Sequence, residues 1–216
     1  CYNTFMIKLV EEQKHLKAGA NIIIGIDEVG RGPMAGPVCA SACGFYAKDI
    51  SALKKIIAKT KKFHKVNDSK KLNEKIREDL AKIIKQEPLL FFATASVSHK
   101  IIDKINIQNA SELAMQKAIG KLKLSSLKDA FLLIDGNRLK NKYLSAIPHK
   151  LIIKGDGKVF LIAAASIIAK TFRDKLMIKY DKAFPKYGFA KHKGYGTKKH
   201  FEIIKQHGLS KIHRKS

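Results

Sequence analysis

Four acidic residues stand at the ends of apolar stretches, or just beyond them, where the chain is expected to turn. They are Asp27, Glu28, Asp135 and Asp156. In open α/β sheets, functional sites lie at strand ends, particularly the carboxyl ends of parallel strands. Carboxylates gathered at one edge would repel one another unless a cation lay between them. The four acids therefore predict a site for a hard divalent cation such as Mg²⁺, which prefers oxygen ligands.

A site of this kind suits hydrolysis of a phosphodiester bond. Two divalent ions about 4 Å apart can activate a water molecule and stabilise the leaving oxygen during in-line attack on phosphorus. For each acid alone there is an alternative, because Asp commonly forms turns after a strand. That alternative explains Asp27 less well, since Glu28 and a Gly-Arg-Gly sequence follow it.

Hydrophobic periodicity and turn residues predict the elements that position these acids. The expected strands are 21–26, 37–45, 89–97, 131–134 and 150–153. The expected helices are 4–18, 51–59, 73–86, 107–123, 159–180 and 197–206, and a lysine-rich loop spans 59–71. A hairpin of the first two strands, followed by alternating helices and strands, predicts an α/β domain with a mixed sheet. We expect one domain over 1–216, with a core at about 21–180 and a basic helical segment at about 181–216 that binds substrate.

The composition indicates a polyanionic partner. The chain has 216 residues, with 43 Lys and Arg against 18 Asp and Glu, and a formal net charge of +25. This excess opposes compaction by self-repulsion, which nucleic acid or an anionic membrane would relieve. No apolar run approaches the roughly 20 residues of a membrane span. Nucleic acid is therefore the favoured partner, and no membrane association is expected.

The cysteines indicate a reducing compartment. Cys39 and Cys43 lie in an apolar segment with no His, Asp or Glu near them in the sequence. The odd total of three cysteines provides no complete disulfide framework. We predict buried thiols at these two positions and, because the start lacks the pattern of a signal peptide, a cytoplasmic protein.

Two basic loops carry groups that bind phosphate or sugar. Ser69 and Lys70 offer a hydroxyl and an ammonium group, although such a loop is equally often a solvated surface. From 191 onward there are eight Lys or Arg and one acid, and Tyr195 lies there between two glycines. An aromatic ring in a basic loop can stack on a base or sugar, or pack on the core.

Several segments together resemble the ribonuclease HII family, the type 2 ribonucleases H. The specific ones are Gly-Ile-Asp-Glu-Val-Gly-Arg-Gly at 25–32 and Ala-Ala-Ala-Ser-Ile-Ile-Ala-Lys at 163–170. The other matching segments are 35–38, 68–72, 134–137, 154–156, 194–197 and 212–214. They follow the family's order from about residue 21 onward, so the resemblance covers roughly nine-tenths of the chain.

The resemblance implies a ribonuclease H-like fold, with a central mixed sheet flanked by helices and a helical C-terminal region. It implies hydrolysis of RNA in RNA–DNA hybrids and incision on the 5′ side of single ribonucleotides in duplex DNA, leaving 5′-phosphate and 3′-hydroxyl ends. Two Mg²⁺ or Mn²⁺ ions would serve this reaction. Roles in ribonucleotide excision repair and DNA replication would follow.

Roles transfer from the family to individual positions. The metal-binding acids would be Asp27, Glu28, Asp135 and Asp156, as the residue pattern already predicts. The backbone of Gly30, Arg31 and Gly32 would sense the 2′-hydroxyl, and Tyr195 would stack on the sugar at the junction. The expected phosphate or backbone contacts are Ser69, Lys70 and Ser166. Asp174 also matches the family, but a carboxylate on a long helix commonly pairs with a nearby Lys or Arg.

Two other functions are possible for a chain with these features. Ribonuclease HIII shares the fold, but usually carries an extra N-terminal domain and lacks the Arg found here at 31. A non-catalytic RNA- or hybrid-binding protein would also explain the charge, but would need neither metal nor the four acids. We expect a monomer that binds RNA–DNA hybrid and ribonucleotide-containing duplex. For a replication-clamp contact, 206–213 provides no clear motif.

Overall fold

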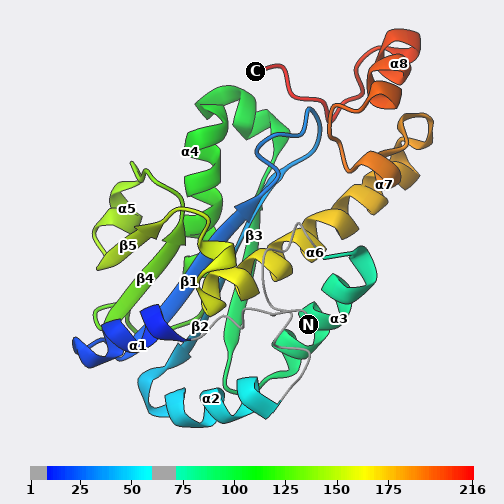
Figure 1. The fold of residues 1–216 in the computed structure, drawn as a ribbon. Helices are drawn as coiled ribbons and strands as arrows, with labels where there is room; N and C mark the ends of the chain where they lie inside the picture. The colour runs from blue at the N-terminus through cyan, green and yellow to red at the C-terminus, as the bar shows by residue number, and fades with distance from the viewer. Residues whose placement is uncertain (1–8, 60–71) are drawn as a thin grey trace.

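A five-stranded mixed sheet forms the centre of the computed structural model, which describes residues 9–59 and 72–216 (Figure 1). The strands are β1 (Ile22–Val29), β2 (Val38–Tyr46), β3 (Phe91–Val97), β4 (Ala130–Asp135) and β5 (His149–Ile152), in the spatial order β3-β2-β1-β4-β5. β2 pairs antiparallel with both β1 and β3, whereas β1, β4 and β5 run parallel. The predicted hairpin and mixed sheet are confirmed.

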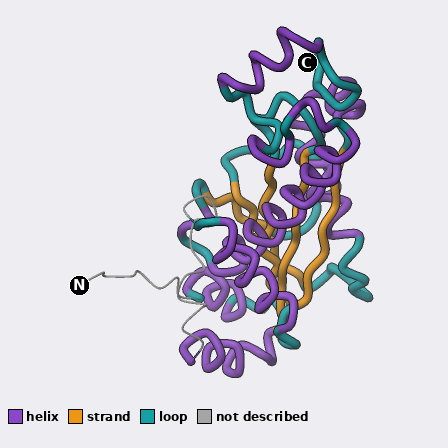
Figure 2. Tube along the Cα trace, turned by 90° about the vertical axis from the view of Figure 1, so that its right-hand side faces the viewer, coloured by secondary structure: helices purple, strands orange, loops and turns teal. Residues whose placement is uncertain are grey.

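Helices cover both faces of the sheet (Figures 1 and 2). One face packs against α1 (Val10–Lys17), α2 (Ile50–Lys59), α3 (Glu74–Gln86) and α6 (Phe160–Ala183). The other packs against α4 (His99–Gly120) and α5 (Lys142–Ser145). Successive side chains of a strand point to opposite faces, so Ile23 contributes to the first core and Ile24 to the second.

The buried first half of α6 crosses β1 at very close range. A Cβ added at Gly25 would collide with the backbone of Leu161 and Ile162. Because glycine has no side chain, the helix can approach the strand close to the end that carries Asp27 and Glu28. On the same face of the sheet, Glu12 of α1 reaches the start of α6, where its carboxylate accepts a hydrogen bond from the Leu161 amide (3.0 Å).

The C-terminal region is helical and extends beyond one end of the sheet (Figure 1). It contains a 3₁₀ turn, η4 (Pro185–Tyr187), and a short α-helix, α7 (Phe189–His192). A longer helix, α8 (Lys198–His207), follows. A small core that includes Met177, Phe189 and Ile212 joins it to α6. The chain then returns to the loop after β1, where the Arg214 amide donates to the carbonyl of Met34 (2.8 Å).

The structure changes some expected boundaries. β1 continues to Val29, past the two acids, because 27–29 keep pairing with β2. α4 begins at His99, eight residues before the predicted helix, and bends at Asn106 (φ 63°, ψ 166°). α5 and α7 were not predicted. The described part of the predicted helix 4–18 is α1.

The sequence predicted burial of the two internal cysteines. Cys39 and Cys43 are both buried free thiols, as predicted. Burial raises the pKa of each thiol to about 12, which keeps both protonated and unreactive at neutral pH. Among the described residues, no helix is long and apolar enough to cross a membrane.

Candidate active site

The strands β1 and β4 are parallel neighbours in register. This brings three of the four predicted acids together at the carboxyl ends of these strands. Ile26 pairs with Ile134, so Asp27 and Asp135 follow at equivalent positions on adjacent strands. Glu28 is the next residue on β1. Asp156 lies in the 3₁₀ turn η3 (Gly155–Gly157) after β5, the strand beside β4.

Asp27 lies at the centre of the group and is only 4% exposed. Burial raises its pKa well above the usual value, and the charges of Glu28, Asp135 and Asp156 raise it further. A hydrogen bond from Ser166 opposes this rise. The Asp27 carboxylate is therefore repelled by each of the other three acids, a conflict that a bound cation would relieve.

Glu28 presents an unsatisfied oxygen to the site. Its Oε1 accepts a hydrogen bond from Nη1 of Arg31 (3.2 Å). Its Oε2 is buried and has no hydrogen-bond partner among the residues that the structure describes. Burial raises the pKa of Glu28, while Arg31 lowers it. A buried acceptor without a partner is costly, and a bound cation would satisfy it.

The donor set fits a divalent cation such as Mg²⁺ or Mn²⁺, which binds carboxylate oxygens. The side chains are not yet arranged around an ion, since within 9–59 and 72–216 no group of three or more His, Cys, Asp or Glu is placed to hold a metal. Among the four acids, Asp135 also has a structural contact, because its Oδ1 accepts a hydrogen bond from the Gly155 amide (2.6 Å).

The Gly30–Gly32 loop and Tyr195 are neighbours. A Cβ added at Gly32 would lie 4.0 Å from the Tyr195 ring, which is 41% exposed. The guanidinium of Arg173 lies over the same ring, 5.8 Å from its centre. Gly30 has φ 94°, and any side chain there would collide with Arg173. Residues separated by more than 160 positions thus form one surface beside Glu28.

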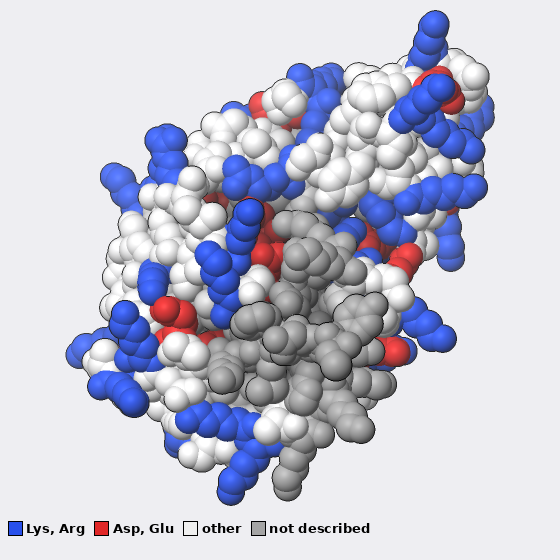
Figure 3. Space-filling model, in the orientation of Figure 1, with Lys and Arg blue, Asp and Glu red and all other residues white. Residues whose placement is uncertain are grey.

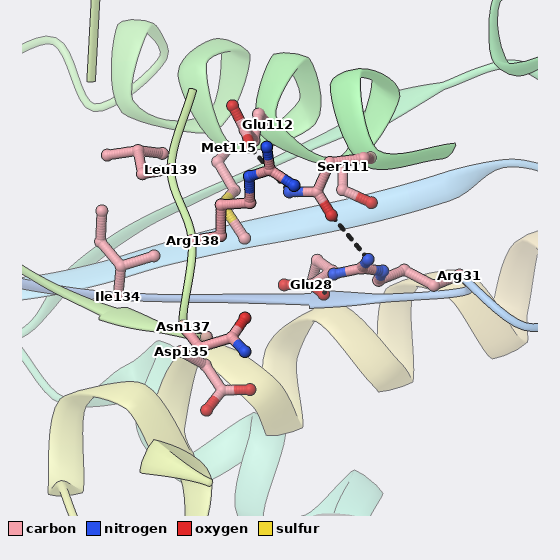
Figure 4. Close-up of a pocket in the computed structure, with 12 residues that line it drawn as sticks. Glu28, Arg31, Ser111, Glu112, Met115, Ile134, Asp135, Asn137, Arg138 and Leu139 are labelled. Carbon is pink, nitrogen blue, oxygen red and sulfur yellow. Dashed lines mark hydrogen bonds and ion pairs between the residues drawn. The ribbon is translucent and has the colours of Figure 1, made fainter. Parts of the chain in front are cut away.

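A pocket of about 440 Å³ opens between this surface and α4 (Figure 4). Arg31 donates from Nη2 to Oε1 of Gln108 (2.7 Å), and Gln108 donates to Oε1 of Glu112 (2.7 Å). Glu112 is buried, and its second oxygen accepts the Lys140 amide (3.0 Å). Sequence reasoning missed Gln108 and Glu112, since polar residues at this spacing also occur on ordinary solvated helix faces.

The remaining predicted residues have different locations. Ser166 is buried and hydrogen-bonds Asp27, so its hydroxyl supports a carboxylate as it stands. Ser69 and Lys70 lie outside the described residues. Asp174 accepts hydrogen bonds from Lys170 (2.6 Å) and Arg77 (3.3 Å), the pairing expected of a carboxylate on a long helix.

The chain as a whole is strongly basic, with a formal net charge of +25. On the face seen in Figure 3, Lys and Arg side chains are widely spread, and a small group of acidic atoms lies near the middle. Positive charge of this kind attracts a polyanion without reading its sequence.

Comparisons with known proteins identify the family. A family model described as ribonuclease HII matches residues 24–216. The chain belongs to the ribonuclease HII family. Ribonuclease HII of Chlamydia caviae is 46% identical over 212 residues, which cover 98% of this chain and 91% of that protein. Ribonuclease HII of Endomicrobium trichonymphae is 49% identical over 192 residues, covering 89% and 83%.

The fold agrees with a solved ribonuclease HII. The structure of the PCNA:RNase HII complex from Archaeoglobus fulgidus matches with a TM-score of 0.69 and 25% identity, covering 90% of this chain and 94% of that one. The chain is thus a type 2 ribonuclease H, a hydrolase that acts on RNA–DNA hybrids and depends on divalent metal. Membership of the ribonuclease HII family disfavours both the ribonuclease HIII alternative and the non-catalytic binder.

Proposed function

We propose that this ribonuclease HII also incises duplex DNA on the 5′ side of a single embedded ribonucleotide, leaving 5′-phosphate and 3′-hydroxyl ends. The observation that carries the proposal is the Gly30–Gly32 loop, which begins two residues after Glu28 and lies against Tyr195. This arrangement sets a surface suited to a 2′-hydroxyl and its sugar beside four acids suited to metal-assisted hydrolysis.

In the proposed mechanism, two ions, Mg²⁺ or Mn²⁺, would be held by Asp27, Glu28, Asp135 and Asp156. The bound ions would activate a water molecule and stabilise the departing 3′-oxygen. Ser166 holds the Asp27 carboxylate in place through its hydrogen bond. Most of the catalysis of phosphoryl transfer comes from positioning and charge stabilisation, which these groups would provide.

Backbone amides and an aromatic ring share the recognition of the ribonucleotide. The amides of Arg31 and Gly32 meet the 2′-hydroxyl, the group that distinguishes RNA from DNA. Tyr195 stacks on the sugar at the junction. The phosphates are held by Ser69, Lys70 and the basic segment at about 181–216. The chain forms one domain over 1–216 and acts as a monomer. The cellular role that follows is ribonucleotide excision repair and replication in the cytoplasm.

A labelled DNA duplex with one ribonucleotide tests this function, with an all-DNA duplex and a long RNA–DNA hybrid beside it. We expect incision on the 5′ side of the ribonucleotide with Mg²⁺ or Mn²⁺, none with chelator, and none in the all-DNA duplex. Cleavage of the hybrid without incision of the single-ribonucleotide duplex would contradict the proposal and favour a specificity like that of ribonuclease HIII.

A further inference from the structure

The side chain of Arg214 is bonded to the loop that follows β1. Its guanidinium donates to the carbonyls of Gly30 (2.6 Å), Arg31 (2.8 Å) and Gly36 (3.1 Å). In the sequence, Arg214 is 184 residues from Gly30 and 183 residues from Arg31. These bonds involve none of the proposed metal ligands, and the proposed function includes Arg214 only as one member of the basic segment at about 181–216.

Holding a carbonyl also orients the amide on the other side of its peptide bond. The described residues contain no cis peptide bond. In a trans peptide, the C=O of one residue and the N–H of the next point in opposite directions. Arg214 therefore directs the N–H groups of Arg31 and Gly32 away from itself. Within 9–59 and 72–216, neither N–H donates a hydrogen bond to another group.

Charge strengthens the effect. A hydrogen bond to an ionised donor is about twice as strong as a neutral one. Such a bond also polarises the peptide that accepts it, which makes the opposite N–H a better donor. Burial, and the neighbouring charge of Arg173, lower the pKa of Arg214 to about 10, so the guanidinium remains ionised at neutral pH.

A second guanidinium, that of Arg173, binds the same loop at residues that follow the recognition peptides. Arg173 is fully buried and donates to the carbonyls of Pro37 (3.0 Å), Ala35 (3.2 Å) and Lys193 (3.0 Å). It thus fixes the base of the loop to the segment that carries Tyr195. Arg214 contacts the recognition peptides themselves, which separates its role from the general anchoring by Arg173.

We propose that Arg214 is a specificity-determining positioning residue, which orients and polarises the Arg31 and Gly32 amides toward the 2′-hydroxyl of the substrate. The inference rests on the proposed function of this loop. Loss of the guanidinium should therefore reduce the preference for a ribonucleotide more than it reduces affinity for duplex DNA in general.

Binding by the full chain carrying Asp135→Asn tests this, because the substrate then stays uncut. Fluorescence anisotropy in Mg²⁺ gives the ratio of Kd for an all-DNA duplex to Kd for the same duplex with one ribonucleotide. We expect Arg214→Gln to lower that ratio about tenfold, the usual scale of one lost hydrogen bond. Lys215→Gln removes the same charge from the next, exposed residue and should leave the ratio unchanged.

The outcomes separate the two proposals. If the Asp135→Asn protein itself binds both duplexes equally, recognition of the 2′-hydroxyl fails, and the Arg214 inference fails with it. If it discriminates and Arg214→Gln keeps the full ratio, only the Arg214 inference is overturned. A parallel fall in affinity for both duplexes would show a phosphate contact instead. Circular dichroism checks that each variant is folded. If Arg214→Gln is unfolded, the same measurement is made on Arg214→Lys, which keeps the positive charge but not the forked guanidinium.

Discussion

The carboxylate of Asp135 accepts a 2.6 Å hydrogen bond from the backbone amide of Gly155. The acid at the end of β4 thus holds the turn that carries Asp156, the acid beyond β5. One side chain has two tasks in this arrangement, as a structural acceptor and as a proposed metal ligand. Substitutions that keep one task and remove the other can separate them.

Asp135→Asn should abolish cleavage while leaving the fold largely intact. The amide oxygen of Asn can still accept from Gly155, but the charge needed to hold a cation is gone. We expect cleavage of an RNA–DNA hybrid to fall by at least about 100-fold, the scale of losing one preorganised electrostatic group. Thermal unfolding and hybrid affinity should change little. Magnesium-dependent turnover near the wild-type rate would refute the assignment of Asp135.

Ser166→Ala should weaken metal activation rather than substrate binding. Its hydroxyl supports Asp27, and loss of a group that orients a ligand typically costs 10- to 100-fold in metal affinity. Titrating Mg²⁺ against hybrid cleavage should therefore show a half-maximal concentration raised about tenfold or more, with KM for hybrid near wild type. Thr171→Val is the matched control, because that hydroxyl, also buried on α6, donates to the Ile167 carbonyl and to no other described residue. A raised KM with unchanged metal dependence would instead assign Ser166 to the phosphate.

Glu12 makes stability depend on pH. Burial raises its pKa from 4.5 to about 7 in the folded protein. A raised folded-state pKa gives stabilisation that is complete below pH 4.5 and lost as the pH rises through 7. Relative to Glu12→Gln, the wild type should therefore lose up to about 3 kcal/mol of unfolding free energy across this range.

Its neighbour provides a control of opposite sign. The Glu11 carboxylate bonds Lys150 (2.7 Å), which lowers its pKa. Its stabilisation is present above pH 4.5 and lost at lower pH, so Glu11→Gln should differ from wild type mainly above that value. Urea unfolding from pH 4 to 8 measures both variants. A Glu12→Gln curve parallel to that of the wild type would contradict the assignment.

Gly25→Ala should destabilise the sheet and impair catalysis together. The added methyl would collide with the α6 backbone, which cannot move like a flexible side chain. Overpacking typically costs about 1–3 kcal/mol. Displacing β1 would also shift Asp27, two residues further on. Gly120→Ala at the end of α4 meets no atom within 4 Å and should stabilise the protein slightly. Equal melting temperatures for the two variants would rule out the close approach.

The sheet and its acids could be predicted from the sequence because both depend on short, local patterns. Each predicted strand was an apolar run, and Asp135 marked the end of one of them. The start of α4 could not be predicted, because Asn106 has a left-handed φ that interrupts the helical spacing. Pairing with β2 is a tertiary effect, which is why β1 extends through Asp27 and Glu28 beyond its apolar run.

The residues that support the site were the least predictable part. Arg214 stands in a basic tail, where the matching segment 212–214 includes it but nothing in the sequence indicates what its side chain contacts. Its role depends on carbonyls more than 170 residues away. Gln108 and Glu112 likewise become recognisable only when α4 is placed against Arg31. Short-range patterns identified the candidate ligands, whereas long-range contacts revealed their supports.

The hydrogen bonds from Arg214 to Gly30 and Arg31 also bear on the order of folding. Closing a loop of 183 or 184 residues costs more chain entropy than pairing β1 with β2, so these bonds are expected to form late. During synthesis, the strands that carry Asp27, Glu28 and Asp135 emerge from the ribosome well before residue 214. A nascent chain can thus assemble its acidic edge before its loop has been set to distinguish ribose from deoxyribose.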